Sequence, residues 1–493
     1  MKVDHQAVIV GAGFGGMGAA IALQRAGVDD FVVLEREDDL GGTWYVNHYP
    51  GLTVDIPSAT YSYSFEPNPN WLHVFARGTE LKAYCDQVAA KHGLRSHMRF
   101  GVTVTSARWD DDADTWVVAL ADGSTLTARH LITATGFLSR PAMPDIAGVD
   151  TFAGTVVHTA QWDDDLDLTG RRAAVIGTGA TSVQLVPTIA RDVADLTVFQ
   201  RTPIWVFPKL DRKISPRVRQ LFRRFPVTQR ASRFAGWGLV EALLVFGVLH
   251  YRQFGWTNAI AAKIATKHLH SQVKDPELRR KLTPSYTFGC KRPTVSNDYF
   301  RTFTKPHVHL ATDPIERIEP DAIVTAGGVR HEIDTLVLAT GYNLWDLGFP
   351  PFEIIGRDGR NLGKWWREEG FQSYLGSSVP KFPNLLTLDG PWVYSGLSYF
   401  QTLEPQMTII ERLFGELTRT KSRRWEVKES AHVAFRNRML NGLRSSVFQR
   451  GNCAGAHSYY FTPSGETPLL RTTSTISTAR EAKTFPLSNF TFN

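Results

Sequence analysis

The sequence predicts an α/β protein made of two similar parallel-sheet domains, and two observations support this prediction. An apolar run, a glycine-rich turn and a helical stretch follow one another at 7–26 and again at 173–190. Several short strand-like runs follow each unit and lead into the same tripeptide, Ala-Thr-Gly, at 134–136 and at 339–341. The length of 493 residues and the hydrophobic content of 43% suit two or three domains with large cores.

The first unit has the residue types of a dinucleotide-binding turn. Its strand at 7–10 leads into Gly11-Ala12-Gly13-Phe14-Gly15-Gly16. Gly11 permits a tight turn, Gly13 lets the backbone approach a pyrophosphate, and Gly16 lets helix and strand pack closely. The next strand ends at Glu35, whose carboxylate can accept hydrogen bonds from ribose hydroxyls. A glycine turn without a ligand is the alternative, but the complete strand, helix and acid favour a bound dinucleotide.

The second unit predicts a different nucleotide. Its strand at 173–176 leads into Gly177-Thr178-Gly179-Ala180-Thr181-Ser182, where Ser182 replaces the third glycine. The following strand ends at Arg201 and Thr202 instead of an acid. A guanidinium grips a 2′-phosphate with two hydrogen bonds, whereas a carboxylate would repel it. We therefore expect FAD or NAD in the first unit and NADPH in the second; the alternative for Arg201 is a solvated surface cation.

Charge and cysteine content argue against several other classes of protein. The net charge of +7 is small for a chain of this size and gives no indication of nucleic-acid binding. Cys85, Cys290 and Cys453 are far apart and form no CxxC pair, which argues against a disulfide framework, a zinc ribbon and a dithiol redox centre. The buried strand at 7–10 leaves no room for a signal peptide, so we expect a reducing, cytoplasmic location.

A helical insertion is expected at 209–285, within the second nucleotide-binding domain. It is rich in arginine and contains a nearly continuous apolar run at 234–249. That run is shorter than the about 20 residues that a membrane span requires, and it contains Glu241. We expect a buried helix that caps the active site; peripheral membrane attachment through basic and apolar faces is the alternative.

One further segment connects the two units and carries the most specific pattern in the chain. It reads Phe152-Ala-Gly154-Thr-Val-Val-His158-Thr-Ala-Gln-Trp162-Asp163. By its residues alone it is an amphipathic linker with one histidine, and no HExxH or cysteine cluster accompanies His158, so we expect no metal. Phe152, Gly154, His158 and Trp162 match every fixed position of the signature FxGxxxHxxxW(P/D). In this respect the chain resembles the class B flavoprotein monooxygenases, and among them the Baeyer–Villiger monooxygenases.

The resemblance implies site residues beyond the two glycine turns. Gly42, Thr43 and Trp44, the segment from Tyr49 to Asp55, and Tyr61 are implied as walls of the flavin pocket. Arg292 is implied as the active-site cation and Asp55 as the carboxylate that orients it. Lys291, together with Arg201 and Thr202, is implied to bind the 2′-phosphate of NADPH. The motif histidine is implied to be a structural and conformational element.

Two departures from the family pattern affect these expectations. Thr53-Val54 stands before the aspartate where the family often has Arg-Cys, so the contacts of Asp55 are expected to differ. Near the C-terminus, Ser458-Tyr459-Tyr460 stands where Ser-Trp-Tyr is common. That segment contributes to the substrate side of the pocket, so the substrate range cannot be transferred by analogy.

The implied reaction is the oxygenation of a ketone. NADPH reduces FAD, O2 adds to give a C4a-peroxyflavin, and the peroxide attacks the carbonyl to yield an ester or lactone. The alternatives are S- or N-oxygenation by the same flavin species, an uncoupled NADPH oxidase, and a flavoprotein that uses its nucleotides only as structural ligands. A pyridine nucleotide disulfide oxidoreductase would need a close cysteine pair beside the flavin, which the cysteine spacing argues against.

The expected division of the chain follows the two units. The FAD domain is discontinuous, and the NADPH domain is inserted into it and itself contains the helical insertion. The predicted boundaries, in chain order, are 1–145 (FAD), 146–208 (NADPH), 209–285 (insertion), 286–345 (NADPH) and 346–493 (FAD).

Overall fold

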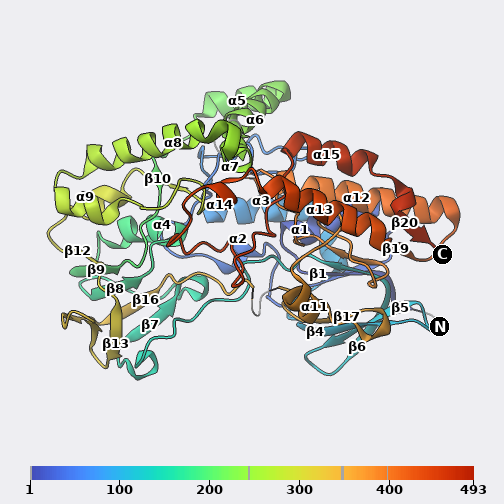
Figure 1. Cartoon of the computed structure of the whole chain (residues 1–493), viewed down its shortest axis with the longest axis horizontal. Coiled ribbons are helices and arrows are strands. Elements are labelled where there is room, and N and C mark those ends of the chain that lie inside the picture. The colour runs from blue at the N-terminus through green and yellow to red at the C-terminus, as the bar shows by residue number, and fades with distance from the viewer. Residues whose placement is uncertain (1–2, 242–244, 346–348, 397) are drawn as a thin grey trace.

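Two sheets with helices packed on them form the two halves of the protein; one sheet is entirely parallel and the other is mixed (Figure 1). The structure is a computed structural model that describes residues 3–241, 245–345, 349–396 and 398–493. Both predicted units are present, and each has its glycine turn between a central strand and a helix. The α/β fold class with two Rossmann-like halves is confirmed.

The first sheet is built around β1 (His5–Val10), which lies between β6 and β2. Residues 7–10 are all buried, as expected for a parallel strand covered on both faces. The strand order is β17-β4-β5-β6-β1-β2-β3, with β18 also paired to β6. The other strands are β2 (Phe31–Leu34), β3 (Met98–Arg99), β4 (Val104–Asp110), β5 (Thr115–Leu120), β6 (Thr125–Thr133), β17 (Glu353–Ile355) and β18 (Leu385–Thr387).

The second sheet is entirely parallel, in the order β12-β9-β8-β16-β7. Its outer strand β7 (Thr155–His158) comes from the signature segment, which is therefore part of a sheet and not only a linker. The remaining strands are β8 (Arg172–Ile176), β9 (Asp195–Phe199), β12 (Val308–Ala311) and β16 (Thr335–Leu338).

The small antiparallel sheet attached to the second half differs from the sequence prediction. It consists of β13 (Ile315–Glu319), β14 (Ala322–Thr325) and β15 (Arg330–Glu332). The strand-like run at 336–338, which leads into the second Ala-Thr-Gly segment, instead belongs to β16 in the main sheet. Residues 330–332 are Arg-His-Glu and contain no apolar side chain, so periodicity could not identify β15.

Helices begin directly after both glycine turns. α1 (Phe14–Arg25) packs against α12 (Tyr399–Thr420), which places C-terminal residues beside the first turn. The chain thus returns to the first half after the second half is complete. Further elements are α2 (Thr43–Val46), α3 (Gly78–Lys91), α4 (Ala180–Ile189), α10 (Tyr299–Thr302), α11 (Leu362–Glu369), α13 (Glu429–Leu443), α14 (Val447–Arg450), α15 (Thr475–Thr484), β10 (Val206–Phe207), β11 (Thr294–Val295), β19 (Trp425–Val427) and β20 (Phe490–Phe492).

The arginine-rich segment is helical over most of its described length. It contains α5 (Pro216–Arg224), α6 (Pro226–Val240), α7 (Phe246–Leu249), α8 (Tyr251–Gln272) and α9 (Pro276–Leu282). Of the apolar run at 234–249, residues 242–244 lie outside the described residues, Val245 and Leu249 are buried, and Phe234 and Phe246 are exposed. The expectation of a buried helix is therefore wrong for the start of the run, which lies at the surface in α6. Within the described part of the chain, every helix is too short or too polar to cross a bilayer.

Cys290 and Cys453 form a disulfide, which corrects the expectation from their spacing. They are 163 residues apart in sequence, yet their Cα atoms lie 5.3 Å from each other. The loop at 451–453 hydrogen-bonds to Thr287, whose backbone amide donates to the Asn452 carbonyl at 2.8 Å. Loop packing brings the two sulfur atoms together, and no sequence spacing reveals such packing. Cys85 is free and buried.

Candidate active site

A cavity of about 2470 Å³ lies between the two halves, and both glycine turns border it. Its walls come from the first unit, the second unit and the C-terminal region, so residues more than 400 positions apart face the same space. This is the position at which open α/β sheets bind ligands, beyond the carboxyl ends of their strands.

The first glycine turn is shaped to accept a phosphate group. Gly11 has φ of 104°, and a Cβ there would lie 2.5 Å from the Ala134 carbonyl oxygen, in the first Ala-Thr-Gly segment. A Cβ on Gly16 would lie 1.8 Å from the Gly11 carbonyl oxygen, so α1 can approach the turn only without a side chain. A Cβ on Gly13 would lie 3.5 Å from the Gly42 Cα, so the backbones of these two glycines approach each other closely. The turn and the N-terminus of α1 therefore fit a pyrophosphate.

Glu35 lies at the edge of this turn and is buried. Its Oε2 accepts a hydrogen bond from the Ala12 amide at 2.6 Å, and its Oε1 accepts one from the Glu37 amide at 3.1 Å. Burial raises the pKa of the carboxyl, although both amides oppose this. Each oxygen keeps further acceptor capacity toward the cavity, as a ribose partner requires.

The second glycine turn repeats the geometry of the first. Gly177 has φ of 116°, and a Cβ there would lie 2.3 Å from the carbonyl oxygen of Ala339, in the second Ala-Thr-Gly segment. Ser182 is fully buried, and its Oγ donates to the Gly177 carbonyl at 2.7 Å. The hydroxyl thus replaces the missing glycine by a hydrogen bond. Nothing lies within 4 Å of a Cβ built on Gly179, which leaves its backbone open to a ligand.

The two cationic side chains Arg201 and Lys291 gather beyond this second turn, together with His457. Burial, and to a smaller extent the nearby charge of Arg201, lowers the pKa values of Lys291 and His457. Burial and the Arg201 charge together lower the pKa of Lys291 to about 8. Thr202 Oγ1 donates to the Gly455 carbonyl at 3.4 Å, which ties the cluster to the C-terminal loop. Sequence reasoning missed His457, although it directly precedes the Ser458-Tyr459-Tyr460 segment, because nothing local relates it to Arg201.

Arg292 and Asp55 form a two-pronged ion pair at the wall of the cavity. Arg292 Nε donates to Asp55 Oδ2 at 2.9 Å, and Nη2 donates to Oδ1 at 3.2 Å. Arg292 Nη1 also donates to the Tyr394 hydroxyl at 3.4 Å. Burial lowers the pKa of the guanidinium, but attraction from Asp55 outweighs this and raises it well above its usual range. The site therefore holds a permanent cation in a fixed orientation.

The segment before Asp55 is anchored to the second half of the protein. Gln184 on α4 accepts from the Thr53 amide and donates to the Thr53 carbonyl, both at 3.0 Å. Lys209 Nζ donates to Thr53 Oγ1 at 2.6 Å. Of these contacts, the one from Lys209 uses the side chain of Thr53 and so depends on threonine at a place where the family often has arginine. Together the contacts couple the position of Asp55 to the second nucleotide unit.

Aromatic side chains form another wall of the cavity. Trp44 Nε1 donates to the Tyr61 hydroxyl at 3.2 Å, and Phe14 meets Tyr61 edge to face. Gly42 has φ of 54° and lies against Gly13. These flat apolar surfaces suit a planar aromatic ring system.

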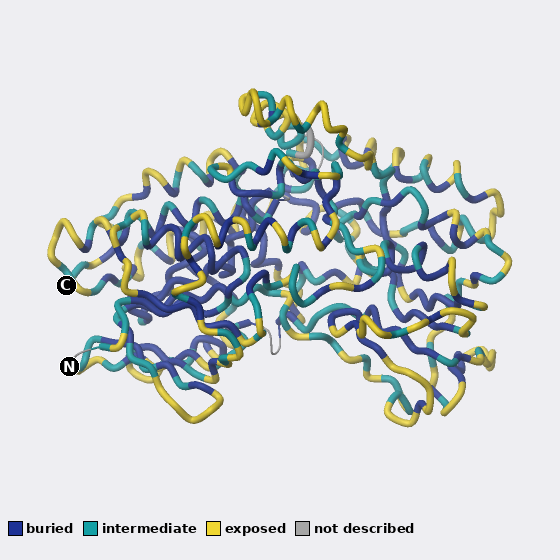
Figure 2. The backbone as a smooth tube through the Cα atoms, turned by 180° about the vertical axis from the view of Figure 1, so that it is seen from behind, coloured by how far each residue is buried: buried dark blue, intermediate teal, exposed yellow. Residues whose placement is uncertain are grey.

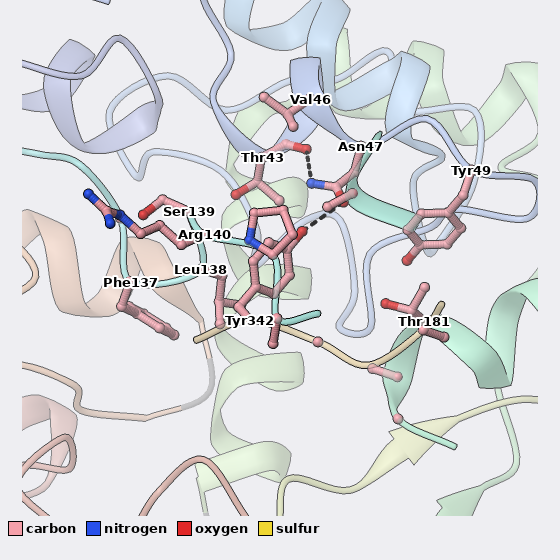
Figure 3. Close-up of a pocket in the computed structure, with 18 of the residues that line it drawn as sticks. Thr43, Val46, Asn47, Tyr49, Phe137, Leu138, Ser139, Arg140, Thr181 and Tyr342 are labelled. Carbon is pink, nitrogen blue, oxygen red and sulfur yellow. Dashed lines mark hydrogen bonds between the residues drawn. The ribbon is translucent and has the colours of Figure 1, made fainter. Parts of the chain in front are cut away.

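Figure 3 shows how the two halves meet at the cavity. Asn47 Nδ2 donates to the Thr43 carbonyl at 3.0 Å, and its Oδ1 accepts from the Tyr342 hydroxyl at 2.9 Å. Tyr342 follows the second Ala-Thr-Gly segment, so the two units share this hydrogen-bond chain. Thr181 lies below Tyr49 in the same view.

The signature residues lie outside the cavity wall. Phe152 and Trp162 are buried, and a Cβ on Gly154 would lie 2.4 Å from the Asp334 carbonyl oxygen. His158 Nδ1 accepts from the Ala160 amide at 3.1 Å, and burial lowers the pKa of the ring. A neutral ring that holds a backbone turn agrees with a structural element. Among the described residues, no group of three His, Cys, Asp or Glu side chains is placed to hold a metal ion.

Asp389 is a buried carboxylate on the cavity wall that sequence reasoning did not select as a site residue. It accepts from the Gly136 amide at 3.1 Å and from the Tyr399 hydroxyl at 3.2 Å. Burial raises its pKa to about 6, and the two hydrogen bonds only partly oppose this. A carboxylate in this position is a candidate hydrogen-bond acceptor for a ligand hydroxyl.

Asp389→Asn is expected to stabilise the flavin-free protein. Since the folded-state pKa is above the unfolded one, the ionised carboxylate costs about 3 kcal/mol of stability at neutral pH. The variant should therefore melt at a higher temperature than the parent above about pH 6, and the difference should vanish below about pH 4, where both forms are neutral. Thermal unfolding followed by circular dichroism from pH 3.5 to 8 measures this. Equal melting temperatures at pH 8 would contradict it.

Most of the residues selected from the sequence border the cavity. Gly16, Ser182 and the four signature residues do not, because they pack behind it. Neither Cys290 nor Cys453 borders it, so the disulfide does not provide the cysteine pair beside a flavin that a disulfide oxidoreductase needs. The selected residues that border the cavity are Gly11, Gly13, Phe14, Glu35, Gly42, Thr43, Trp44, Asp55, Tyr61, Gly177, Gly179, Ala180, Thr181, Arg201, Thr202, Lys291 and Arg292.

Comparison with known proteins gives one consistent family. The model of a family described as "Pyridine nucleotide-disulphide oxidoreductase" matches residues 8–233. A Baeyer–Villiger monooxygenase of Streptomyces coelicolor is 37% identical over 484 residues, which cover 98% of this chain and 91% of that protein. A second Baeyer–Villiger monooxygenase, from Pseudomonas aeruginosa, is 37% identical over 461 residues, with coverage of 92% and 85%.

Solved structures agree over the full length. Cyclohexanone monooxygenase from Rhodococcus sp. Phi1, bound to NADP+, superposes with a TM-score of 0.87 at 27% identity, and the match covers 100% of both chains. OTEMO in complex with FAD and NADP gives the same TM-score, identity and coverage. With two glycine turns around one cavity, an Arg292–Asp55 pair on its wall and relatives that match from end to end, this chain belongs to the Baeyer–Villiger monooxygenase family.

Proposed function

We propose that this protein uses FAD, NADPH and O2 to insert one oxygen atom next to a ketone carbonyl, which yields an ester or lactone. The observation that carries the proposal is the Arg292–Asp55 ion pair on the wall of a cavity that both glycine turns border. The same cavity would accept one dinucleotide at each glycine turn. Bound FAD supplies the redox chemistry and the activation of O2.

The residues of the first unit fit FAD. The cradle of Gly11, Gly13 and Gly16 would hold its pyrophosphate at the N-terminus of α1, and Glu35 would bind a ribose. Trp44 and Tyr61, with the Gly42-Thr43 backbone, would contact the ring system. Asp389 would accept a hydrogen bond from a polar group of the same ligand.

The residues of the second unit fit NADPH. Gly177 to Ser182 would hold the pyrophosphate, while Arg201, Thr202 and Lys291 would bind the 2′-phosphate with two positive charges and a hydroxyl. His457 lies beside this cluster and, when protonated, adds to its positive charge. Strand β9 is followed by Gln200 and Arg201. The second unit therefore lacks the carboxylate that Glu35 provides after the second strand of the first unit.

Arg292 is proposed to stabilise the negative charge that develops on oxygen during the reaction. Its side chain is 18% exposed, so water screens its charge only weakly. Asp55 fixes the guanidinium by two hydrogen bonds and acts as a positioning residue. Because Thr53 is bonded to Gln184 on α4, movement of the second half can shift this pair relative to the first turn.

A small apolar cavity on the other side of Arg292 is the proposed place for the hydrocarbon part of the ketone. Val245, Val248 and Leu249 border it, and so do Phe288 and Tyr460. The end of the apolar run, residues 245–249, therefore covers Arg292. We propose that this cover keeps water away from the reacting oxygen atoms.

The signature residues are proposed to set the relative position of the two halves. Phe152, Gly154, His158 and Trp162 pack beneath β16, whose end carries the second Ala-Thr-Gly segment. We also propose the domain boundaries 145/146, 208/209, 285/286 and 345/346. They agree with the order in which the chain passes between the two sheets. Limited proteolysis with mass spectrometry tests them, since cleavage should concentrate at exposed loops near these positions.

A cytoplasmic location is likewise proposed, because NADPH is an intracellular reductant. Alkylation of free thiols in lysed cells, before and after reduction, tests whether Cys290 and Cys453 are paired there. Fractionation of the cells locates the protein itself.

The direct test of the reaction is a product balance. The purified protein with FAD is supplied with NADPH, O2 and either a cyclic ketone or a thioether. Ketone oxygenation predicts one lactone for each NADPH consumed and a slower reaction with the thioether. The reverse preference would favour heteroatom oxygenation, and hydrogen peroxide as the sole product with both would favour an oxidase.

Binding of NADPH is expected to weaken as the pH rises through about 8. Lys291, whose pKa is lowered to about 8, must be protonated to attract the 2′-phosphate. Below that pH the KM for NADPH should be constant, and above it the KM should rise about tenfold per pH unit. Steady-state kinetics between pH 7 and 9.5 measure this, with NADH, which lacks the 2′-phosphate, as the control. Lys291→Arg should flatten the profile, and parallel profiles for NADPH and NADH would contradict the assignment.

A further inference from the structure

The helices α5 and α6 stand at the outer edge of the protein, on top of the insertion (Figure 1). Seen from behind, most of their backbone is exposed (Figure 2). We call their outward side the α5–α6 surface. Its members are the apolar residues Val218, Leu221, Phe225, Val227 and Phe234 and the basic residues Arg217, Arg224 and Arg230.

The apolar stripe of α5 faces away from the core. Val218 and Leu221 are spaced as i and i+3 and so lie on one face of the helix, and Phe225 directly follows its last residue. Such a face normally packs against the protein, yet no residue of α5 is buried and these three are 39%, 44% and 49% exposed. Arg217 and Arg224 flank the stripe and are exposed as well.

The next helix continues the same surface. The inner face of α6 is attached by polar contacts: Gln229 Nε2 donates to the Asn68 carbonyl at 2.6 Å, and Arg233 Nη1 donates to the Ser62 carbonyl at 2.7 Å. On the outer face, Val227 and Phe234 are 68% and 69% exposed, with the exposed Arg230 between them. Polar contacts thus hold the helix in place while its large apolar side chains point outward.

Positive charge is concentrated in this part of the chain. The stretch from 209 to 234 contains nine Lys or Arg residues and one acidic residue, Asp211. Because the net charge of the whole chain is +7, the remaining residues carry slightly more acidic than basic side chains. The excess positive charge of the protein therefore comes from the segment that also exposes six large apolar side chains, the five of the α5–α6 surface and Leu210.

We propose that the α5–α6 surface docks on the surface of a bilayer that contains anionic phospholipids. Arginines would contact the lipid phosphates, while the aromatic and aliphatic side chains between them would enter the boundary of the acyl chains. A second copy of the chain suits the surface less well, since a twofold contact would place like charges opposite each other. A nucleic acid would neutralise the arginines but leave Leu221, Phe225 and Phe234 without an apolar partner.

Docking of this kind places the insertion, which covers Arg292, next to the phase in which apolar ketones accumulate. The inference does not depend on the proposed reaction, because binding to lipid is measured without substrate or NADPH. A negative result for lipid binding therefore does not contradict the proposed reaction, and a negative result for the reaction does not contradict lipid binding.

The test is sedimentation of the full-length, FAD-loaded protein with vesicles. One set contains phosphatidylcholine alone, and the other contains equal parts of phosphatidylcholine and phosphatidylglycerol. We expect binding to the anionic vesicles only, with strong weakening at 0.5 M NaCl. For insertion, Leu221→Cys labelled with an environment-sensitive dye should shift its emission to the blue on the anionic vesicles, since Cys85 is buried and the other cysteines are paired.

Two pairs of substitutions separate the contributions of charge and apolar contact. Arg217→Gln with Arg224→Gln should weaken binding about thirtyfold, as each basic residue near an anionic surface contributes about fivefold. Leu221→Ser with Phe225→Ser should weaken it about tenfold or more. The matched controls are Arg191→Gln with Lys428→Gln and Val329→Ser with Ile476→Ser, which change exposed residues elsewhere and should bind like the parent.

Three outcomes would overturn the proposal. The first is equal affinity for both vesicle types or for parent and charge variant. The second is a concentration-dependent dimer, seen by size-exclusion chromatography and lost in the Leu221→Ser, Phe225→Ser variant, without vesicle binding. The third is tight binding to a DNA duplex with no emission shift on vesicles.

Discussion

Replacing Arg292 with alanine is expected to lower the rate of ketone oxygenation about a thousandfold, the upper range seen when a group that stabilises a developing oxyanion is removed. Arg292 supplies a buried cation that Asp55 holds with two hydrogen bonds. FAD content and reduction by NADPH should be retained, because Arg292 is part of neither glycine turn. NADPH should then be consumed with release of hydrogen peroxide in place of lactone.

Further variants separate charge from geometry. Arg292→Lys keeps the charge but cannot make the two-pronged contact with Asp55, so its rate should lie between those of the parent and the alanine variant. Asp55→Asn should lower the rate through loss of positioning while FAD remains bound. Arg301→Ala, which removes a mostly exposed arginine on α10, is the control and should be fully active. Normal lactone yield from Arg292→Ala would refute the assigned role.

Gly16→Ala is expected to abolish FAD binding. Its Cβ would lie 1.8 Å from the Gly11 carbonyl oxygen, so the first glycine turn or α1 must move. The atoms that the Cβ would meet belong to the backbone of Gly11, which cannot rotate away as a side chain could. The turn would therefore lose the shape that fits a pyrophosphate. Purified Gly16→Ala protein should contain little flavin, as measured by its absorbance ratio at 450 and 280 nm, and should unfold at a lower temperature than the parent.

Gly415→Ala is the matched control for this experiment. Gly415 lies within α12, and a Cβ there meets nothing within 4 Å. Alanine is the better helix former, so this variant should bind FAD normally and be at least as stable as the parent. Full flavin content in Gly16→Ala would show that the turn adapts and would contradict the close-packing role of this glycine.

Local patterns predicted the two nucleotide units well. The strand, the glycine turn and the first turns of the helix are determined by residues close in sequence, and the structure has them within a few residues of the predicted positions. The difference between Glu35 and Arg201 after the second strand of each unit likewise follows from local sequence. The signature at 152–162 indicated the family, although its place in the second sheet was not foreseen.

Several parts of the site had no local signal. Asp389 lies beside Gly136, 253 positions away, because β18 pairs with β6. Gln184 contacts Thr53 across 131 positions, and His457 approaches Lys291 through the loop that carries Cys453. Strand β15 was missed for a local reason: its residues are all polar and so show no alternation of apolar and polar side chains.

By itself, the sequence determined which chemical groups this protein has and where its strands and helices begin, because propensity, glycine turns and strand periodicity act over a few residues. The family resemblance implied the pairing of Arg292 with Asp55, but only the tertiary structure decided that Cys290 contacts Cys453 and that Asp389 contacts Gly136. Such contacts depend on how strands pair and loops pack between segments that are hundreds of residues apart in sequence. The exposed α5–α6 surface is decided in the same way, since an amphipathic pattern predicts a helix but not whether the protein covers its apolar face.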